Sequence, residues 1–298
     1  MTTKMDPLDI AVPRNQTALM QHLQLLAGRE GHRIWCGGVI GREKLPAFVA
    51  KMAARYPITR NTRQRTYDRT RGIAVTHFVA FPVGNEVHWW LLSDGGVGGL
   101  ADMKSEDARV ARDAMSADGH ITFRDYVLLY ATKREWREVE SAKAGKRKGF
   151  YKQTSTWTWK LRGDVIRELR RSIEDCCEGL EYGSEGGNGQ KPWGLRGLLA
   201  SMRARPLFSA VRSQVLALHR DALELWKPRQ ALWCARHPAL AQQYGQHAGA
   251  LTPINELLAT RMPKMRRIRV FDEQPITLRD LLPANSTPSA APKVEAMQ

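Results

Sequence analysis

The chain has 298 residues, and its 46 lysines and arginines against 30 aspartates and glutamates give a formal net charge of +16. Hydrophobic residues make up 43% of the chain, which excludes wholesale disorder, and no apolar run approaches the roughly 18 residues that a membrane span needs. The first residues contain no apolar leader, and the four cysteines lack the C-x-x-C spacing of a zinc ribbon. We therefore expect a reduced, soluble, cytoplasmic protein that contacts no membrane. Its charge predicts a polyanionic partner, and nucleic acid is the commonest such partner.

Hydrophobic periodicity and turn residues predict alternating strands and helices in the first half of the chain. In chain order these are a helix over 17–26, a strand over 32–41, a helix over 42–56, strands over 73–81 and 86–92, a helix over 105–115 and a strand over 123–134. Pro82-Val83-Gly84-Asn85 between the two middle strands predicts a β-hairpin. From residue 32 onward, this is the element order of a ferredoxin-like or RNA-recognition-like (RRM-like) sandwich.

The second half is predicted to be mainly helical after one further strand and helix. Trp157 and Trp159 alternate with polar residues in a strand over 155–163, and Asp164 can cap the helix that follows, over 164–181. The last predicted elements are a glycine-rich boundary over 182–197, helical segments over 198–260 broken at Pro228, Pro238 and Pro253, a basic strand or extended arm over 261–270 and a short helix near Leu278–Leu282.

These elements predict an α+β protein in four parts. They are an N-terminal helix in 1–31, a ferredoxin-like RNA-binding domain with an extra strand and helix in 32–181, a mainly helical, basic C-terminal region in 198–283 and a disordered tail in 284–298.

Basic residues are concentrated in clusters with interleaved aromatic residues. The stretch 55–71 holds six arginines against one aspartate, and we interpret it as an arginine-rich loop that also contains Tyr56 and Tyr67. Arginine is informative because its planar guanidinium binds phosphate in a bidentate manner and stacks on bases. The alternative for each single cluster is a solvated surface loop. The candidate RNA-binding residues are Arg60, Arg63, Arg65, Arg69, Arg71, Lys146, Arg147, Lys148, Arg167, Arg170, Arg171, Arg266, Arg267 and Arg269.

No motif for metal-, nucleotide- or serine-dependent chemistry stands out. The eight histidines form no H-E-x-x-H pair, the glycines of 95–99 lack the G-K-S/T of a phosphate loop, and acids are scarce where arginines are dense. We therefore expect no metal and no cofactor. Metal-free RNA cleavage needs a group that deprotonates the 2′-hydroxyl, a group that protonates the leaving 5′-oxygen, and a cation that stabilises the phosphorane. The catalytic candidates are His32, His77 and Arg42, the last at a predicted helix start that favours phosphate.

Each candidate also has an ordinary structural interpretation. His77 shares a strand face with apolar residues and suits a core histidine, whereas His32 suits an exposed histidine and Arg42 a surface cation. The Trp89-Trp90 pair is expected in the core, because the run VHWWLL is apolar on both faces.

Three features resemble CRISPR RNA-processing endoribonucleases of the repeat-associated (RAMP) superfamily, especially its divergent, plasmid-borne type IV branch. They are the strand–helix step HRIWCGGVIGREKLPAF, the hairpin around 82–85 and the arginine run 60–71, so the resemblance covers roughly residues 30–135. It implies a protein that binds the stem-loop RNA of a CRISPR repeat, cuts at its base by metal-independent 2′-hydroxyl attack, and stays bound with other subunits of an effector complex. Family members usually have a glycine-rich loop near the C-terminus, whereas helices are predicted after 182–197.

A second hypothesis comes from another class of protein. The helical, basic C-terminal half also suits a non-catalytic plasmid or mobile-element protein that binds nucleic acid during replication or mobilisation. Binding to RNA hairpins or to duplex DNA distinguishes the two hypotheses.

Overall fold

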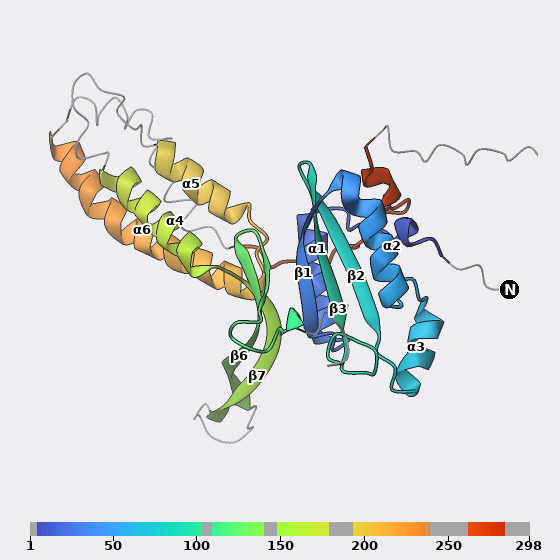
Figure 1. The fold of residues 1–298 in the computed structure, drawn as a ribbon. Helices are drawn as coiled ribbons and strands as arrows, with labels where there is room; N and C mark the ends of the chain where they lie inside the picture. The colour runs from blue at the N-terminus through green and yellow to red at the C-terminus, as the bar shows by residue number, and fades with distance from the viewer. Residues whose placement is uncertain are drawn as a thin grey trace, which may run out of the picture. The chain divides into compact units, whose positions relative to one another are not determined.

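A computed structural model describes residues 5–102, 109–139, 148–178, 193–236, 238 and 262–283. The chain is an α+β protein with two antiparallel sheets (Figure 1). It folds as two compact units: Met1–His120 together with Ile268–Gln298, and Ile121–Arg267. The predicted α+β class is confirmed, but the units have other bounds than the predicted domains.

The sheet of the first unit has the strand order β2-β3-β1-β4. β1 (Ile34–Gly41) pairs with β3 (Glu86–Ser93) and with the two-residue β4 (Arg112–Asp113), and β2 (Thr76–Val83) pairs with β3. All neighbouring pairs are antiparallel, so β1 and β2 run parallel on either side of β3. The predicted hairpin is confirmed, and its turn residue Gly84 has a positive φ of 59°.

Helices α1 (Gln16–Gly28) and α2 (Leu45–Arg55) cover opposite faces of this sheet (Figure 1). Because strand side chains alternate between faces, Phe78 and Leu91 join Leu45 and Val49 of α2 in one buried cluster. Their strand neighbours Val79, Trp90 and Leu92 are buried outside that cluster, as are Leu19 and Leu23 of α1. The core position expected for the tryptophan pair is thus confirmed: Trp90 is buried, and Trp89 packs against the α2 cluster.

Residues 62–70 form a helix, α3 (Thr62–Thr70), so the prediction of an arginine-rich loop over 55–71 is wrong for this part. The Asn61 side chain accepts a hydrogen bond from the Gln64 backbone, and the Gln64 side chain accepts one from the Asn61 backbone. This capping box satisfies two backbone donors of the first turn, which explains how so polar a sequence starts a helix.

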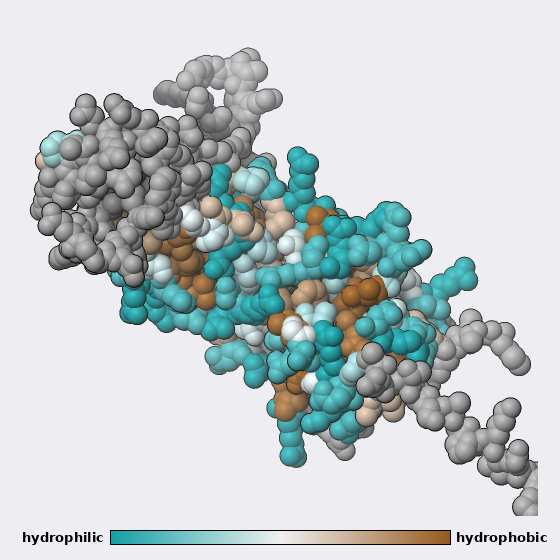
Figure 2. All heavy atoms as spheres, turned by 90° about the horizontal axis from the view of Figure 1, so that it is seen from above, coloured by the Kyte–Doolittle hydropathy of each residue, from teal (hydrophilic) through white to brown (hydrophobic). Residues whose placement is uncertain are grey.

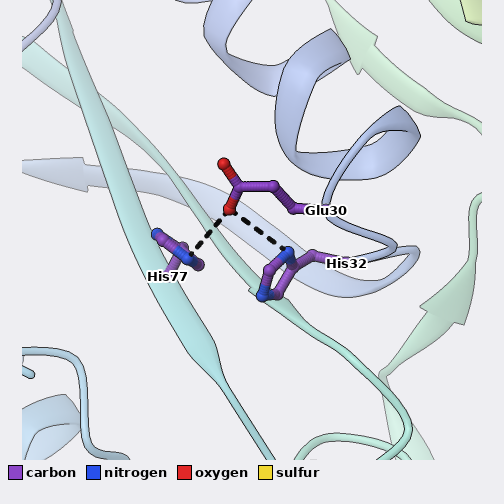
Figure 3. Close-up of side chains that lie close together, drawn as sticks. All are labelled: Glu30, His32 and His77. Carbon is purple, nitrogen blue, oxygen red and sulfur yellow. Dashed lines mark ion pairs between the residues drawn. The ribbon is translucent and has the colours of Figure 1, made fainter. Parts of the chain in front are cut away.

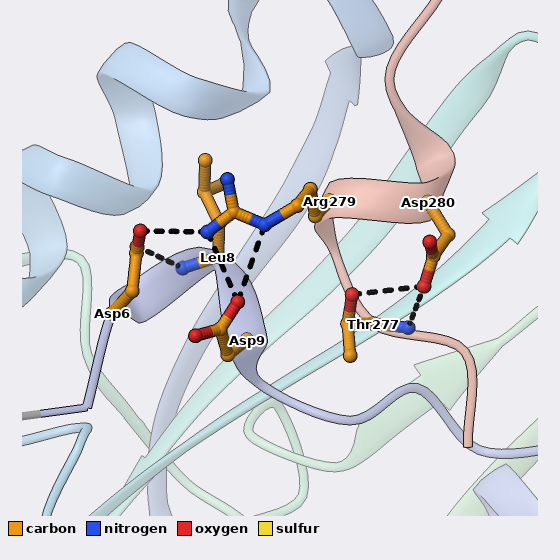
Figure 4. Close-up of polar contacts among 6 residues, drawn as sticks. All are labelled: Asp6, Leu8, Asp9, Thr277, Arg279 and Asp280. Atoms are coloured by element: carbon orange, nitrogen blue, oxygen red, sulfur yellow. Dashed lines mark hydrogen bonds and ion pairs between the residues drawn. The ribbon is translucent and has the colours of Figure 1, made fainter. Parts of the chain in front are cut away.

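The C-terminal segment returns to the N-terminus of the same unit. Ala11 and Thr277 form an antiparallel bridge, next to the short 3-10 helices Pro7–Asp9 (η1) and Arg279–Leu281 (η5). Figure 4 shows the Arg279 guanidinium donating hydrogen bonds to the carboxylates of Asp6, at 2.7 Å, and Asp9, at 3.0 Å. The predicted short helix near 278–282 is therefore present and contributes Leu278 and Leu281 to the α2 cluster.

The second unit consists of a long hairpin and a helical layer. β6 (Tyr126–Val139) pairs with β5 (Ile121–Phe123) and along its full length with β7 (Lys148–Leu161). The helices are α4 (Gly163–Glu178), α5 (Trp193–Arg203) and α6 (Ser209–Arg236); α6 packs on both α4 and β7. Trp159, fully buried on β7, lies 6.4 Å from the ring of Phe208, at the start of α6.

Three predicted elements are wrong in part. The described residues of the helix expected over 105–115 contain the short strand β4 instead. The strand expected over 123–134 lies in the second sheet, because its full-length partner is β7 rather than β1. The residues around Pro228 continue α6, since a proline removes only one helical hydrogen bond and the buried stripe Val211, Val215, Leu218, Ala222 and Trp226 keeps the helix packed. The expected disordered tail and the helical segments beyond 238 lie outside the described residues.

Candidate functional site

Two histidines from distant parts of the sequence meet at one end of the first sheet. His32 precedes β1 and His77 lies on β2, and their rings are in edge-to-face contact with centroids 4.6 Å apart. Glu30, just after α1, places one carboxylate oxygen, Oε2, 3.8 Å from His32 Nδ1 and 3.5 Å from His77 Nε2 (Figure 3). Both histidines were predicted as site residues from the sequence, whereas Glu30 was not.

The backbone between α1 and β1 explains this convergence. Gly31 has a φ of 74°, a conformation that side chains with a Cβ rarely adopt, and it turns the chain sharply between Glu30 and His32. The backbone amide of His32 then donates a hydrogen bond to the Leu26 carbonyl at 2.9 Å, which holds His32 against the last turns of α1. In the sheet, Leu92 of β3 pairs with Trp35, near the start of β1, on one side and with His77 of β2 on the other. His77 is therefore level with the start of β1, across the intervening strand β3.

The His32 ring is buried and lacks hydrogen bonds. Its side chain is 0% exposed, and among the described residues neither ring nitrogen has a hydrogen-bond partner. The side chain of His77 is 12% exposed and that of Glu30 is 36% exposed, so the cluster reaches solvent on the glutamate side. Buried polar atoms are hydrogen-bonded in the great majority of cases, so two orphan nitrogens on one ring are unusual.

Arginines from α3 set the electrostatics of the cluster. Burial lowers the pKa of His77 to about 2, and Arg65, His32, His22 and Arg69 lower it further in that order. Burial also lowers the pKa of His32 to about 4, against an opposing effect of Asp94. Arg69 forms an ion pair with Asp94 at 3.6 Å, while burial lowers the pKa of Arg65 and Glu30 raises it. Both clustered imidazoles are therefore neutral at pH 7.

Neutral, buried imidazoles limit the chemistry of this cluster. A general acid must hold a proton at the working pH, and a general base works best with a pKa near it. His32 and His77 meet neither condition, and His32 cannot touch a substrate. Unprotonated ring nitrogens are, in contrast, the form of histidine that ligates metal ions.

Arg42 lies at the other end of β1, in the short helix η2 (Arg42–Lys44), and donates a hydrogen bond to the Gly84 carbonyl at 2.7 Å. The eight residues of β1 span about 25 Å, so Arg42 does not join His32 and His77 in one site. The three catalytic candidates are thus divided between two ends of the sheet.

The arginines of the 60–71 run have unequal surroundings. Arg60 forms an ion pair with buried Asp68 at 3.3 Å, and Arg69 is paired and Arg65 largely buried as described above. Arg63 and Arg71 are exposed, and neither has an ion-pair partner among the described residues. The Tyr67 hydroxyl, in a side chain that is 59% exposed, accepts from Arg71 at 3.0 Å. Arg63, Tyr67 and Arg71 follow each other at intervals of four residues and therefore form one exposed stripe along α3 and its C-cap residue Arg71, the Arg–Tyr–Arg stripe.

The other predicted RNA-binding residues are described in part. Arg167 and Arg171 are exposed on α4, whereas Arg170 is paired with Asp221 at 3.1 Å. Arg266, Arg267 and Arg269 are exposed in an irregular segment, and Arg269 pairs with Glu273. Lys148 begins β7, next to exposed Phe150 and Tyr151, while Lys146 and Arg147 lie outside the described residues. Figure 2 shows hydrophilic side chains over most of the described surface in view, with hydrophobic areas between them.

Two signals in the sequence point to what was missed. Asn61 and Gln64 have the spacing of a capping box and predict the start of α3. Glu30 stands two residues before His32 across a glycine, which is a weak signal because acids near turns are common.

Comparisons of the chain with models of protein families, with curated proteins and with solved structures find no match. Within the described ranges, no helix combines the length and apolar character needed to cross a membrane.

Proposed function

We propose that this chain is an RNA-binding protein that contacts RNA through the Arg–Tyr–Arg stripe of α3. The observation on which the proposal rests is the contrast within the arginine run. Arg60 and Arg69 are paired with carboxylates, and Arg65 is largely buried. Arg63 and Arg71 are exposed without a carboxylate partner among the described residues, and they flank exposed Tyr67, over whose ring Arg71 lies at 5.4 Å. Guanidinium groups bind phosphate, and the face of the Tyr67 ring that Arg71 does not cover offers a stacking surface for an unpaired base.

The strand order supports the proposed relation to RAMP endoribonucleases. A ferredoxin-like sandwich requires β1 and β2 to lie parallel on either side of β3, with the fourth strand beside β1. The order β2-β3-β1-β4 agrees with this arrangement, although β4 has only two residues. On this basis the RNA would be a CRISPR repeat stem-loop, and other effector subunits would be its further partners.

Cleavage of that RNA is the more specific part of the proposal. The RAMP resemblance implies attack by the 2′-hydroxyl without a metal ion. Because His32 and His77 are neutral and buried, we assign proton transfer to neither. Solvent would take the proton of the 2′-hydroxyl and supply one to the leaving 5′-oxygen, while the stripe arginines stabilise the charge of the phosphorane, as arginine can at any physiological pH.

The salt dependence of RNA binding tests the proposal. We expect the double variant Arg63→Gln/Arg71→Gln to bind a labelled RNA hairpin more weakly, with a log–log salt slope shallower by about 1.4–1.8, because each lost phosphate contact removes about 0.7–0.9. The control Arg162→Gln/Arg279→Gln removes the same charge from exposed arginines that are already paired, Arg162 with Asp164 and Arg279 with Asp6 and Asp9. An unchanged slope in the stripe variant, with a reduced slope in the control, would place the RNA elsewhere.

The alternative function, a non-catalytic plasmid or mobile-element protein, is tested with the same variants. Tighter binding of duplex DNA than of the RNA hairpin at equal salt would favour it. Paired with retained binding by the stripe variant, that result would contradict the RNA proposal.

A further inference from the structure

We propose that Glu30, His32 and His77 form a binding site for one divalent transition-metal ion of the zinc type. Each residue offers one ligand atom, and these three atoms lie within 4.8 Å of one another. Two imidazoles and one carboxylate are a donor set that Zn²⁺ and its first-row neighbours accept. This site goes beyond the proposed RNA binding and does not depend on it.

The three ligand atoms would have to move closer together to hold a common ion. Zn²⁺ bonds of about 2.0–2.2 Å at tetrahedral angles place ligand atoms about 3.3–3.5 Å apart. The Glu30 oxygen is 3.5 Å from His77 Nε2 and 3.8 Å from His32 Nδ1, and all three ligand atoms lie within 4.8 Å of one another. The two imidazole nitrogens are therefore the pair that would have to approach most, by up to about 1.4 Å. Rotation of the partly exposed Glu30 side chain would close the two carboxylate distances, and rotation of the two imidazole rings about their own side-chain torsions would bring their nitrogens together.

The orphan ring of His32 is the second, independent observation. Its side chain is fully buried, and among the described residues neither of its nitrogens has a hydrogen-bond partner. A buried polar atom left unpaired destabilises the fold, and a bound cation would satisfy Nδ1. Nδ1 is also the atom that faces the Glu30 carboxylate (Figure 3).

The surrounding charges oppose a cation in part, and this makes the site more testable. Arg69 is balanced by Asp94, and His22 is a further neutral neighbour. Arg65, which interacts with both Glu30 and His77, is the cation that would repel the ion. We therefore expect Arg65→Gln to tighten metal binding, which is the opposite of what loss of a structural residue would do.

Three protein ligands leave at least one coordination position open. His32 and His77 close the inner side of the cluster, whereas Glu30 is 36% exposed, so the open position faces solvent next to Glu30. Water would occupy it in the free protein.

Calorimetric titration of the metal-stripped full chain with Zn²⁺ tests the proposal. We expect one equivalent to bind the wild type, with affinity at least about 100-fold lower in Glu30→Gln and in His77→Gln, because loss of even an outer-shell partner costs 10–100-fold. The matched control is His88→Gln, on β3 of the same sheet, and its affinity should stay within about twofold of wild type. Co²⁺ replaces Zn²⁺ as a probe, and its visible absorption should disappear in the two ligand variants only.

The controls separate loss of metal from loss of fold. Circular dichroism in EDTA establishes whether each variant is folded, and if His77→Gln is not, the exposed Glu30→Gln decides. The hydrogen-bonded alternative, in which Glu30 moves toward His32 without an ion, predicts no stoichiometric Zn²⁺ binding. That result, or equal affinity in wild type and both ligand variants, would overturn the site, while leaving RNA binding by the Arg–Tyr–Arg stripe untouched.

Discussion

Gly31 shows how one backbone conformation brings functional groups together. Its positive φ of 74° turns the chain between Glu30 and His32, and a Cβ at this position would meet nothing within 4 Å. The constraint is therefore conformational and not steric. For a residue with a Cβ, this region of φ lowers the stability of the folded chain by roughly 1–2 kcal/mol.

We expect Gly31→Ala to lower the free energy of unfolding of the first unit by about 1 kcal/mol, measured by urea titration. Gly197→Ala is the matched control, because Gly197 lies within α5 and its added Cβ also meets nothing within 4 Å. There the same change should stabilise by about 0.5–1 kcal/mol, since alanine is the better helix former. Equal effects at both positions would contradict the conformational explanation.

A second residue-scale prediction concerns His219 on α6. It is buried, and burial lowers its pKa to about 4, with a further lowering by Arg203. The unfolded chain has the ordinary value of about 6.5 and binds the proton more readily, so stability is present above that pH and is lost as pH falls from 6.5 toward 4. Between pH 7 and pH 5 we expect a loss of about 2 kcal/mol in the second unit.

The variant His219→Leu should remove most of this pH dependence, as measured by urea unfolding at both pH values. The control is His120→Gln, at a histidine of the first unit, which should keep the wild-type dependence. A slope of unfolding free energy against pH that is the same in His219→Leu and wild type would refute the assignment.

At the scale of elements, local signals predict secondary structure well and strand partners poorly. The hairpin of β2 and β3 and the buried stripe of α6 follow from turn residues and helical spacing, and both are present. The partner of β6 depends on which distant strand meets its apolar side chains, and periodicity does not contain that information. The pairing of His32 with His77 was likewise a matter of topology, and the sequence predicted the residue types but not their contact.

The capping box of α3 gives the prediction at this scale. Asn61→Ala removes an acceptor for the Gln64 amide, and we expect a loss of about 1 kcal/mol in stability, measured by urea unfolding. Because α3 presents the Arg–Tyr–Arg stripe, RNA affinity should fall as well, with no change of charge. Thr62→Ala, one position along and without a capping role, is the control, and a similar loss there would show that the cap is not the cause.

For the whole molecule, the first unit is discontinuous in sequence, whereas each predicted domain is one continuous range. Residues 268–283 pack against residues 6–14 through backbone hydrogen bonds such as Val12 N to the Ile276 carbonyl and Leu278 N to the Ile10 carbonyl. Glycine-rich composition predicts flexible joints, but it does not predict which distant segments return to the same core. The long β6–β7 hairpin then lies in the unit inserted between the two parts of the first.

The last prediction concerns cleavage by the full chain. A repeat stem-loop RNA should be cut in EDTA and should leave a 2′,3′-cyclic phosphate, because attack by the 2′-hydroxyl displaces the 5′-oxygen and closes the ring on the phosphate. The pH–rate profile should show no inflection between pH 6 and 8, since burial lowers the pKa of His32 to about 4 and that of His77 to about 2, and arginine keeps its proton throughout. RNA binding in EDTA is verified first, so that loss of metal from the Glu30 cluster is not mistaken for loss of chemistry.

His77→Gln should cleave at the wild-type rate, whereas Arg63→Gln/Arg71→Gln should be slower at saturating RNA. A bell-shaped profile with an inflection at pH 6–7, a 3′-hydroxyl product, or activity restored only by added divalent metal would each contradict this mechanism.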